Sequence, residues 1–207
     1  KDQLEQIRLI CGIHPDNFSW RLEPGDSLWL PEVIMAYSAQ GTGDVSRIFH
    51  RAIRENLCRG VWKNKRRPIL INNWEATYFD FTGDQLVSIA QAGAEMGAEL
   101  FVLDDGWFGE RDEDKSGLGD WAPNEKKLGC TLKELGERIR ALDLGFGLWL
   151  EPEGISEDSK LYRAHPDWAV EIPGRKPCLS RSQLVLDFSR SDVQDYIIGV
   201  VSKILSS

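Results

Sequence analysis

The chain has 207 residues, of which 42% are hydrophobic and 28% charged, and this composition indicates a globular protein and excludes a disordered one. Its 33 acidic residues outnumber its 25 basic ones, and the net charge of -8 excludes the broad basic surface of a nucleic-acid-binding protein. No apolar run reaches the length of a membrane span, so we expect no membrane partner and no nucleic-acid partner.

The first part of the chain, residues 1–42, has a β-rich pattern. Short β-favouring segments alternate with turn signals, and they read "EQIRLICGI", "FSWRLEPGDSLWLP" and "EVIMAYSA". This pattern predicts an antiparallel sheet. Residues 43–67 are predicted to form a linking helix and a connector, because apolar residues recur at helical spacing in "GDVSRIFHRAIRENLCRG" and Gly60 ends the run. The basic stretch "WKNKRRP" that follows is interpreted as a solvated linker.

From residue 68 onward, strands and helices alternate. The predicted strands are "PILINN", "LFVLDD", "GFGLWLEP" and "LVLDFS", and the predicted helices cover residues 82–99, 131–143, 156–165 and 191–205. Thr82 is the expected N-cap of the first helix, and capping boxes are expected at Thr131 with Glu134 and at Ser191 with Gln194. Continuously apolar strands between amphipathic helices imply a parallel sheet covered by helices. The predicted fold class is therefore α/β, with four βα units in residues 68–207.

Polar and aromatic side chains lie at, or just after, the carboxyl end of each of the four predicted strands. They are Asn72, Asn73, Trp74 and Glu75 after the first, Asp104, Asp105 and Trp107 after the second, Trp149, Glu151 and Glu153 after the third, and Asp187 after the fourth. The carboxyl ends of parallel strands form the ligand crevice in α/β folds, so we expect these side chains to lie together. Sugars offer hydroxyl groups to carboxylates and an apolar face to flat rings. The pattern therefore predicts a carbohydrate site.

Metals, cofactors and disulfides are not expected. The loop "ERDEDKSGLGDWAPNEKKLG" partly imitates a calcium loop, but Pro123 stands where a bidentate Glu should be. No Gly-rich phosphate loop follows a strand, and the three histidines are interpreted as structural. The spacing of Cys11, Cys58, Cys130 and Cys178 matches neither a metal site nor a disulfide scaffold, which predicts reduced thiols in a cytoplasmic protein.

Several motifs together resemble the bacterial α-galactosidases of glycoside hydrolase family 36. They are "ILINNWEATYFDF", "LDDGWFG", "LGDW", "GLWLEPE" and "LYRAHPDW", and the resemblance extends over nearly the whole chain. It implies that residues 1–42 are the end of an N-terminal β-sandwich and that residues 68–207 are the first half of a (βα)8 barrel. It also implies a homo-oligomeric parent enzyme that removes terminal α-D-galactosyl residues from oligosaccharides such as melibiose and raffinose, with retention of configuration.

The resemblance implies five substrate-binding residues: Trp74, Asp104, Asp105, Trp149 and Arg181. The two aspartates would bind sugar hydroxyls on the O4 and O6 side, and the two tryptophans would form apolar walls. The arginine would donate hydrogen bonds into the site. The family more often has Gly-Arg-Asn where this chain has Ser180-Arg181-Ser182.

The family's catalytic pair has no counterpart in this sequence, since its nucleophile is an aspartate in a Lys-Trp-Asp type motif. We expect that nucleophile and the acid/base beyond Ser207, and we expect the 207-residue chain alone to be inactive. Asp105 and Glu151 are possible substitutes, because retaining hydrolysis needs two carboxyls about 5 to 5.5 Å apart, but the resemblance favours a role in binding hydroxyls. The alternatives are a related α-glycosidase or transglycosylase of the same clan, or a non-catalytic half-barrel or sugar-binding module.

Overall fold

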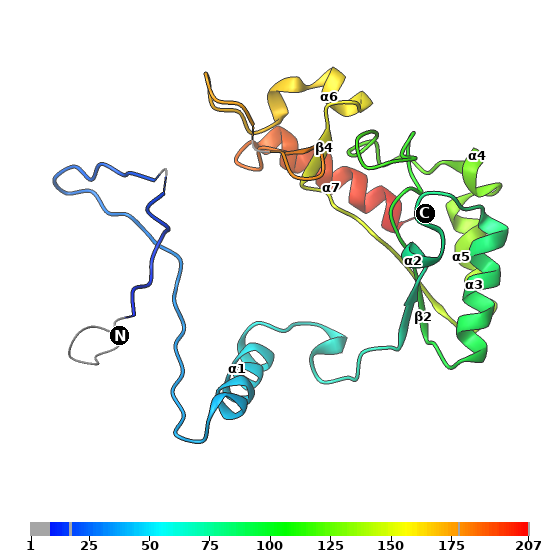
Figure 1. Cartoon of the computed structure of the whole chain (residues 1–207), viewed down its shortest axis with the longest axis horizontal. Helices are drawn as coiled ribbons and strands as arrows, with labels where there is room; N and C mark the ends of the chain where they lie inside the picture. Colours follow the sequence, from blue (N-terminus) through cyan, green and yellow to red (C-terminus); the bar gives the residue numbers. More distant parts are fainter. Residues whose placement is uncertain (1–8, 17, 178, 207) are drawn as a thin grey trace. The chain divides into compact units, whose positions relative to one another are not determined.

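A computed structural model describes residues 9–16, 18–177 and 179–206 of the chain (Figure 1). The chain divides into two compact units, Lys1–Arg66 and Arg67–Ser207. The first unit contains the linking helix as predicted, α1 (Thr42–Asn56), and a single 3-10 turn, η1 (Val61–Lys63). None of the helices within the described ranges is long and apolar enough to cross a membrane.

The antiparallel sheet that the sequence predicts near the N-terminus is not observed. Residues 9–16 and 18–41 contain no helix or strand, and residues 1–8 and 17 lie outside the described part of the chain. Large apolar side chains lie exposed in this segment, among them Trp29 at 92% and Tyr37 at 86%. Strands need a neighbour for their hydrogen bonds and a packed apolar face, and a short hairpin alone is only marginally stable. Within residues 9–16 and 18–41, the β-favouring segments therefore have no strand partner in this structure.

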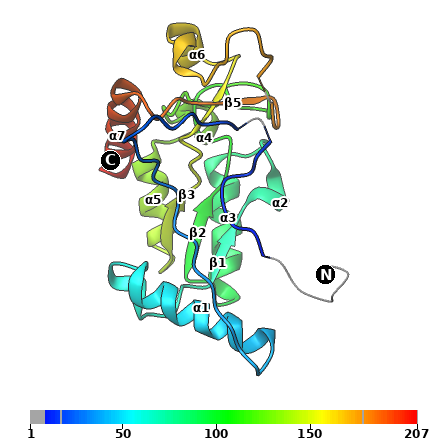
Figure 2. The same ribbon diagram turned by 90° about the vertical axis from the view of Figure 1, so that its left-hand side faces the viewer.

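The second unit has an α/β fold built on a parallel sheet. Its strands β1 (Leu70–Asn72), β2 (Leu100–Leu103) and β3 (Gly145–Leu148) pair in the order β1-β2-β3. Helices α3 (Gly83–Glu95) and α5 (Leu132–Arg140) pack against this sheet and against each other (Figure 2). The first three predicted strands and their parallel arrangement are thus observed.

The core of this unit lies between the sheet and the two helices. Its fully buried members include Leu86 and Ala90 from α3, Phe101 and Leu103 from β2, and Leu135 and Ile139 from α5. A Cβ atom at Gly93 would lie 3.0 Å from the Ile71 side chain. A glycine at this position therefore allows α3 to lie close to β1.

The fourth predicted strand does not join the parallel sheet. It forms β5 (Gln183–Val185), which pairs antiparallel with β4 (Gly154–Ser156), a segment in which the sequence predicted no strand. Leu184 and Leu186 are buried while Val185 is 54% exposed, so this strand is covered on one face only. One-sided burial is typical of antiparallel pairing, whereas strands of a parallel sheet are covered on both faces. The predicted fourth parallel strand is therefore not observed in this structure.

Shorter helices and a C-terminal helix complete the second unit: α2 (Trp74–Thr77), α4 (Glu125–Leu128), α6 (Lys160–Ala164), the 3-10 turn η2 (Pro166–Trp168) and α7 (Ser191–Leu205). A second apolar cluster joins the β4–β5 ribbon to α6 and α7. Its buried members include Ile155, Leu161, Leu184, Val193 and Ile197. This cluster packs the ribbon against these two helices.

Two of the three predicted helix caps are confirmed. Thr82 forms a capping box with Gln85 at the start of α3, and Thr131 forms one with Glu134 at the start of α5. The box predicted for Ser191 and Gln194 is wrong. Gln194 Nε2 instead donates to the carbonyl oxygen of Phe188 at 2.7 Å, so it is directed away from the backbone N–H groups that a cap would satisfy.

These caps predict unequal losses of stability on replacement by alanine. Thr82→Ala and Thr131→Ala should each lower the free energy of unfolding by about 1 kcal/mol, because each removes an acceptor for an unpaired helical N–H group. Ser191→Ala is the matched control and should change it by less than about 0.5 kcal/mol, as for a surface substitution. Urea unfolding of the three variants checks this. An equal loss in all three would contradict the assigned caps.

Candidate substrate-binding site

A cavity of about 420 Å³ lies at the carboxyl ends of the parallel strands. Its lining consists of Trp74, Asp104, Asp105, Asp114, Trp149 and Arg181. All five residues that the sequence proposed for substrate binding therefore line one cavity. Asp114 also lines the cavity, although the sequence did not predict it as a binding residue.

Asp104 is held in place by the end of the neighbouring strand β1. Asn72 donates a hydrogen bond from Nδ2 to Asp104 Oδ2. The backbone N–H of Asp104 donates to Oδ1 of the fully buried Asn73 at 2.8 Å. The N–H of Asp105 donates to Asp104 Oδ1 at 2.7 Å. The half-buried Asp104 is thus fixed at the cavity by Asn72, the last residue of β1, and by Asn73, which follows it.

Asp105 forms a buried ion pair with Arg111. Arg111 Nε donates to Asp105 Oδ1 and Arg111 Nη2 to Asp105 Oδ2, both at 2.8 Å, and the two residues are 0% and 1% exposed. Such a bidentate pair is among the strongest hydrogen-bonded arrangements in proteins. A carboxylate has about four lone-pair sites, so Asp105 keeps acceptor capacity toward the cavity.

Arg111 also organises the loop that follows β2. Its Nη1 donates to three backbone carbonyl oxygens, those of Glu113 at 3.3 Å, Asp114 at 3.2 Å and Ser116 at 2.8 Å. The Arg111 side chain therefore connects Asp105, which lines the cavity, to the backbone of the loop. Arg111 was not predicted from the sequence, where its only signal is one arginine in an acidic segment that begins five residues after Asp105.

Aromatic packing fixes the two tryptophans of the cavity. The Trp149 ring is nearly parallel to Phe108, with an interplanar angle of 8° and a centroid distance of 6.3 Å. Trp107 Nε1 donates to the Trp149 carbonyl oxygen at 3.0 Å. On the other wall, the Trp74 ring meets Phe79 edge-on at a centroid distance of 5.1 Å. Both walls are thus backed by further aromatic residues.

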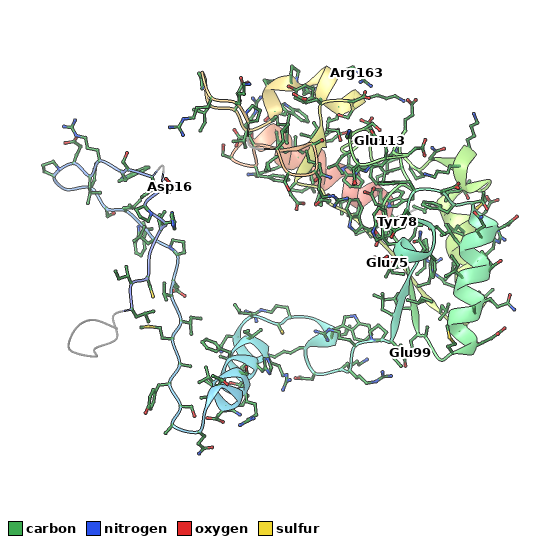
Figure 3. The ribbon with its side chains drawn as sticks, viewed as in Figure 1. Asp16, Glu75, Tyr78, Glu99, Glu113 and Arg163 are labelled. Atoms are coloured by element: carbon green, nitrogen blue, oxygen red, sulfur yellow. The ribbon has the colours of Figure 1, made fainter. Side chains whose placement is uncertain are left out.

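Glu75 on α2 points toward Tyr78, the residue that follows this helix, and both residues are labelled in Figure 3. Tyr78 Oη donates to Glu75 Oε2 at 3.2 Å, and this hydrogen bond raises the pKa of the Tyr78 phenol. Glu75 is not among the residues that line the cavity. The prediction that the acid after the first strand belongs to the ligand crevice is therefore wrong, since Glu75 is paired on the exposed face of a short helix.

The acids after the third and fourth predicted strands also lie outside the cavity lining. Burial raises the pKa of Glu151, the nearby Glu153 adds to the rise, and among the described residues Glu151 Oε2 has no hydrogen-bond partner. Asp187 Oδ1 accepts hydrogen bonds from Ser189 Oγ at 2.6 Å and from Ser189 N at 3.0 Å, and these bonds lower the pKa of Asp187. Asp187 thus stabilises its own turn.

Arg181 reaches the cavity from a tight turn. Arg181 has a φ of 50° and Ser182 a φ of 60°, and the N–H of Gln183 donates to the carbonyl oxygen of Ser180 at 2.9 Å. Positive φ at both central residues identifies a type I′ turn, which favours Asn and Gly at these positions. Arg181 Nη2 donates to Asp114 Oδ1. The turn therefore presents a side chain that the sequence placed in the site by resemblance alone.

The turn predicts a stabilising substitution. Ser182→Asn should raise the free energy of unfolding by a few tenths to about 1 kcal/mol, because Asn tolerates the left-handed conformation better than Ser. Ser180→Asn is the matched control, since the φ of Ser180 is not positive, and it should have little effect. Thermal unfolding of both variants checks this. A lower melting temperature for Ser182→Asn would contradict the type I′ assignment.

Comparisons with known proteins agree with this architecture. The sequence profile of the melibiase family matches residues 27–207. The chain is 52% identical to the α-galactosidase AgaA of Geobacillus stearothermophilus over 206 residues, which are 100% of this chain and 28% of AgaA. It is 50% identical over 205 residues to the bifunctional α-galactosidase/sucrose kinase AgaSK of Mediterraneibacter gnavus, covering 99% of this chain and 22% of AgaSK.

Solved structures of α-galactosidases also match this chain. The crystal structure of the GH36 α-galactosidase AgaB from Geobacillus stearothermophilus matches with a TM-score of 0.86 and 53% identity, over 95% of this chain and 27% of AgaB. An AgaA variant in complex with raffinose matches with a TM-score of 0.87, over 95% of this chain and 27% of that protein. The chain thus spans between a fifth and a third of the length of these relatives. It belongs to the melibiase family, the α-galactosidases of glycoside hydrolase family 36.

Proposed function

We propose that the protein carrying this chain is a retaining α-galactosidase that removes terminal α-D-galactosyl residues from oligosaccharides such as melibiose and raffinose. The chain contributes part of its galactose pocket. The observation that carries this proposal is the cavity in which carboxylates, two tryptophans and an arginine converge at the strand ends. Support comes from the AgaA variants solved in complex with stachyose and with raffinose.

Each lining residue has a suitable chemical role in such a pocket. The Asp104 carboxylate would accept hydrogen bonds from two adjacent hydroxyls of galactose, and Asp105 would use its remaining lone pairs. Trp74 and Trp149 would cover the apolar C–H face of the sugar ring, and Arg181 would donate to a hydroxyl oxygen. The axial O4 of galactose needs an acceptor at its own height in the pocket, which favours galactose over glucose.

We propose that the nucleophile and the acid/base are other residues of the whole protein. Each carboxylate in the cavity lining already has a donor: Asp104 has Asn72, Asp105 has Arg111, and Asp114 has Arg181. Hydrogen-bond donors stabilise the negative charge of a carboxylate and lower its basicity, which suits a residue that binds hydroxyls better than one that attacks or transfers a proton. The same proposal assigns residues 68–207 to the first half of a (βα)8 barrel, which the three parallel strands support.

The proposal extends to the cellular context of the whole protein, a cytoplasmic homo-oligomer. The spacing of the four cysteines along the sequence matches no disulfide scaffold, which suits a reducing compartment. Exposed apolar residues such as Trp29 and Ile34 provide surface that another chain or another part of the protein would cover. Sedimentation of the whole protein measures its mass, and a monomer would contradict the oligomer.

Hydrolysis of aryl α-glycosides by the whole protein tests the proposed activity. We expect cleavage of the α-galactoside with a kcat/KM at least about 100-fold above that for the α-glucoside. A site built to bind the axial O4 hydroxyl of galactose discriminates strongly against a sugar that has no hydroxyl in that position. A preference for another α-glycoside would favour a related activity of the same clan. Galactose binding without any turnover would favour a non-catalytic sugar-binding module.

A further inference from the structure

Asp114 is a cavity residue without a role in the pocket described above. It lies on the loop after β2, and its Oδ1 accepts a hydrogen bond from Nη2 of Arg181, which is 67 residues further along the chain. Both side chains are 47% exposed, and both line the cavity. The pair therefore joins two separate loops at the open side of the site.

Asp114 is itself fixed from the buried side of the loop. Arg111 Nη1 donates to the Asp114 backbone carbonyl oxygen at 3.2 Å, and Arg111 Nη2 lies 3.9 Å from Asp114 Oδ1. Arg111 is in turn held by the buried carboxylate of Asp105. Charges of alternating sign thus run in a continuous chain from Asp105 through Arg111 and Asp114 to Arg181. We name these four residues the ion-pair chain.

Arg181 needs such support more than the other lining residues do. Both cavity tryptophans are backed by aromatic rings, and Asp104 is bonded to Asn72. Arg181 instead extends from an exposed turn, and a free arginine side chain loses much rotamer freedom when it becomes ordered. A carboxylate that holds the guanidinium before the sugar arrives removes part of that loss from the binding step.

We propose that Asp114 is a positioning residue that holds the Arg181 guanidinium toward the sugar, an inference that rests on the proposed function. The ion-pair chain fixes Asp114, and Asp114 fixes Arg181. The effect of Asp114 on substrate binding then passes through Arg181. Asp114 would have an independent effect if it bound the sugar directly or only kept the loop folded.

A double-mutant cycle on the whole protein separates these roles. With an aryl α-galactoside, Asp114→Ala should raise KM by about 10-fold, the smaller value for a hydrogen bond to a charged group, and change kcat by less than about twofold. Arg181→Ala should raise KM at least as much. The double variant should be no worse than Arg181→Ala alone, because Asp114 has nothing left to position. Additive increases in KM would overturn the proposal, as would an unchanged KM in Asp114→Ala.

Asp112→Ala is the matched control from the same loop. Its carboxylate binds Lys127 Nζ at 2.8 Å and does not line this cavity, so KM should stay within about twofold of the wild type. Asp114→Asn keeps the size and one acceptor, so if the alanine variant unfolds, a KM about two- to tenfold above that of the wild type supports positioning. A KM for Asp114→Asn equal to that of the wild type would overturn the proposal in that case.

The same cycle on galactose affinity, measured by calorimetry, makes the test independent of turnover. A wild-type protein that cleaves no α-galactoside would contradict the proposed function. In that event, coupled losses of galactose affinity would still support the role of Asp114, and additive losses would overturn it. An active wild type with an unaltered Asp114→Ala variant would contradict the positioning role alone.

Discussion

Arg111→Ala is expected to lower the free energy of unfolding by about 3–5 kcal/mol, the range for removing one partner of a buried ion pair. The substitution leaves the Asp105 carboxylate 1% exposed and without its two hydrogen bonds. It also removes the donor of three backbone carbonyl oxygens in the loop after β2. Urea unfolding of the whole protein, followed by tryptophan fluorescence, measures the loss.

Arg163→Ala is the control for this prediction. Arg163 pairs with Asp158 at 2.7 Å, and both side chains are more than half exposed. Exposed pairs contribute about 0–1 kcal/mol, so this variant should unfold almost as the wild type does. Arg111→Lys keeps a positive charge but loses the planar two-point contact with the carboxylate. Its loss in free energy of unfolding should lie between those of Arg111→Ala and Arg163→Ala. A loss below about 1 kcal/mol for Arg111→Ala would show that the Asp105–Arg111 pair does not hold this loop.

Asp104→Asn is expected to reduce kcat/KM on an aryl α-galactoside by roughly 10²–10⁴-fold. Two hydrogen bonds from sugar hydroxyls to a charged acceptor are worth about 1.5–3 kcal/mol each, and every 1.4 kcal/mol is a factor of ten. Asparagine keeps the shape of the side chain but offers one neutral acceptor and a donor. Steady-state kinetics on the whole protein, together with its melting temperature, separate this loss from unfolding.

Asp112→Asn is the matched control for that substitution, because it is an exposed acid outside the cavity. Its kcat/KM should stay within about twofold of the wild type. The loss in Asp104→Asn should also be larger for the α-galactoside than for the α-glucoside, since the proposed partner is the axial O4. A decrease in kcat/KM below about fivefold, or an equal decrease on both substrates, would contradict the proposed role of Asp104 in binding galactose.

The strands of the parallel sheet were predictable because local composition determines them. "PILINN", "LFVLDD" and "GFGLWLEP" are apolar runs that end abruptly in polar residues, and helices with clear apolar faces separate them. The segment around Leu184 was not predictable in the same way. Its pairing with Gly154–Ser156 depends on a contact about 30 residues away and on the turn at Arg181, and neither leaves a periodic signal in the sequence.

The cavity was predictable only in part. Asp104, Asp105 and Trp149 lie at the carboxyl ends of predicted strands, so the geometry of a parallel sheet brings them together. Arg111 and Asp114 lie in the segment "ERDEDKS", where most residues are charged and look alike in sequence. Only the folded loop shows that Arg111 is buried while most of its charged neighbours face solvent.

The most direct test of the account is a crystal structure of the whole protein with galactose bound. We predict the sugar in the cavity described here, with two adjacent hydroxyl oxygens within about 2.5–3.2 Å of the Asp104 carboxylate. We predict its apolar face against the Trp74 or Trp149 ring and the Arg181 guanidinium still bonded to Asp114. Galactose bound elsewhere, with the Asp104 carboxylate bonded only to Asn72, would contradict the account.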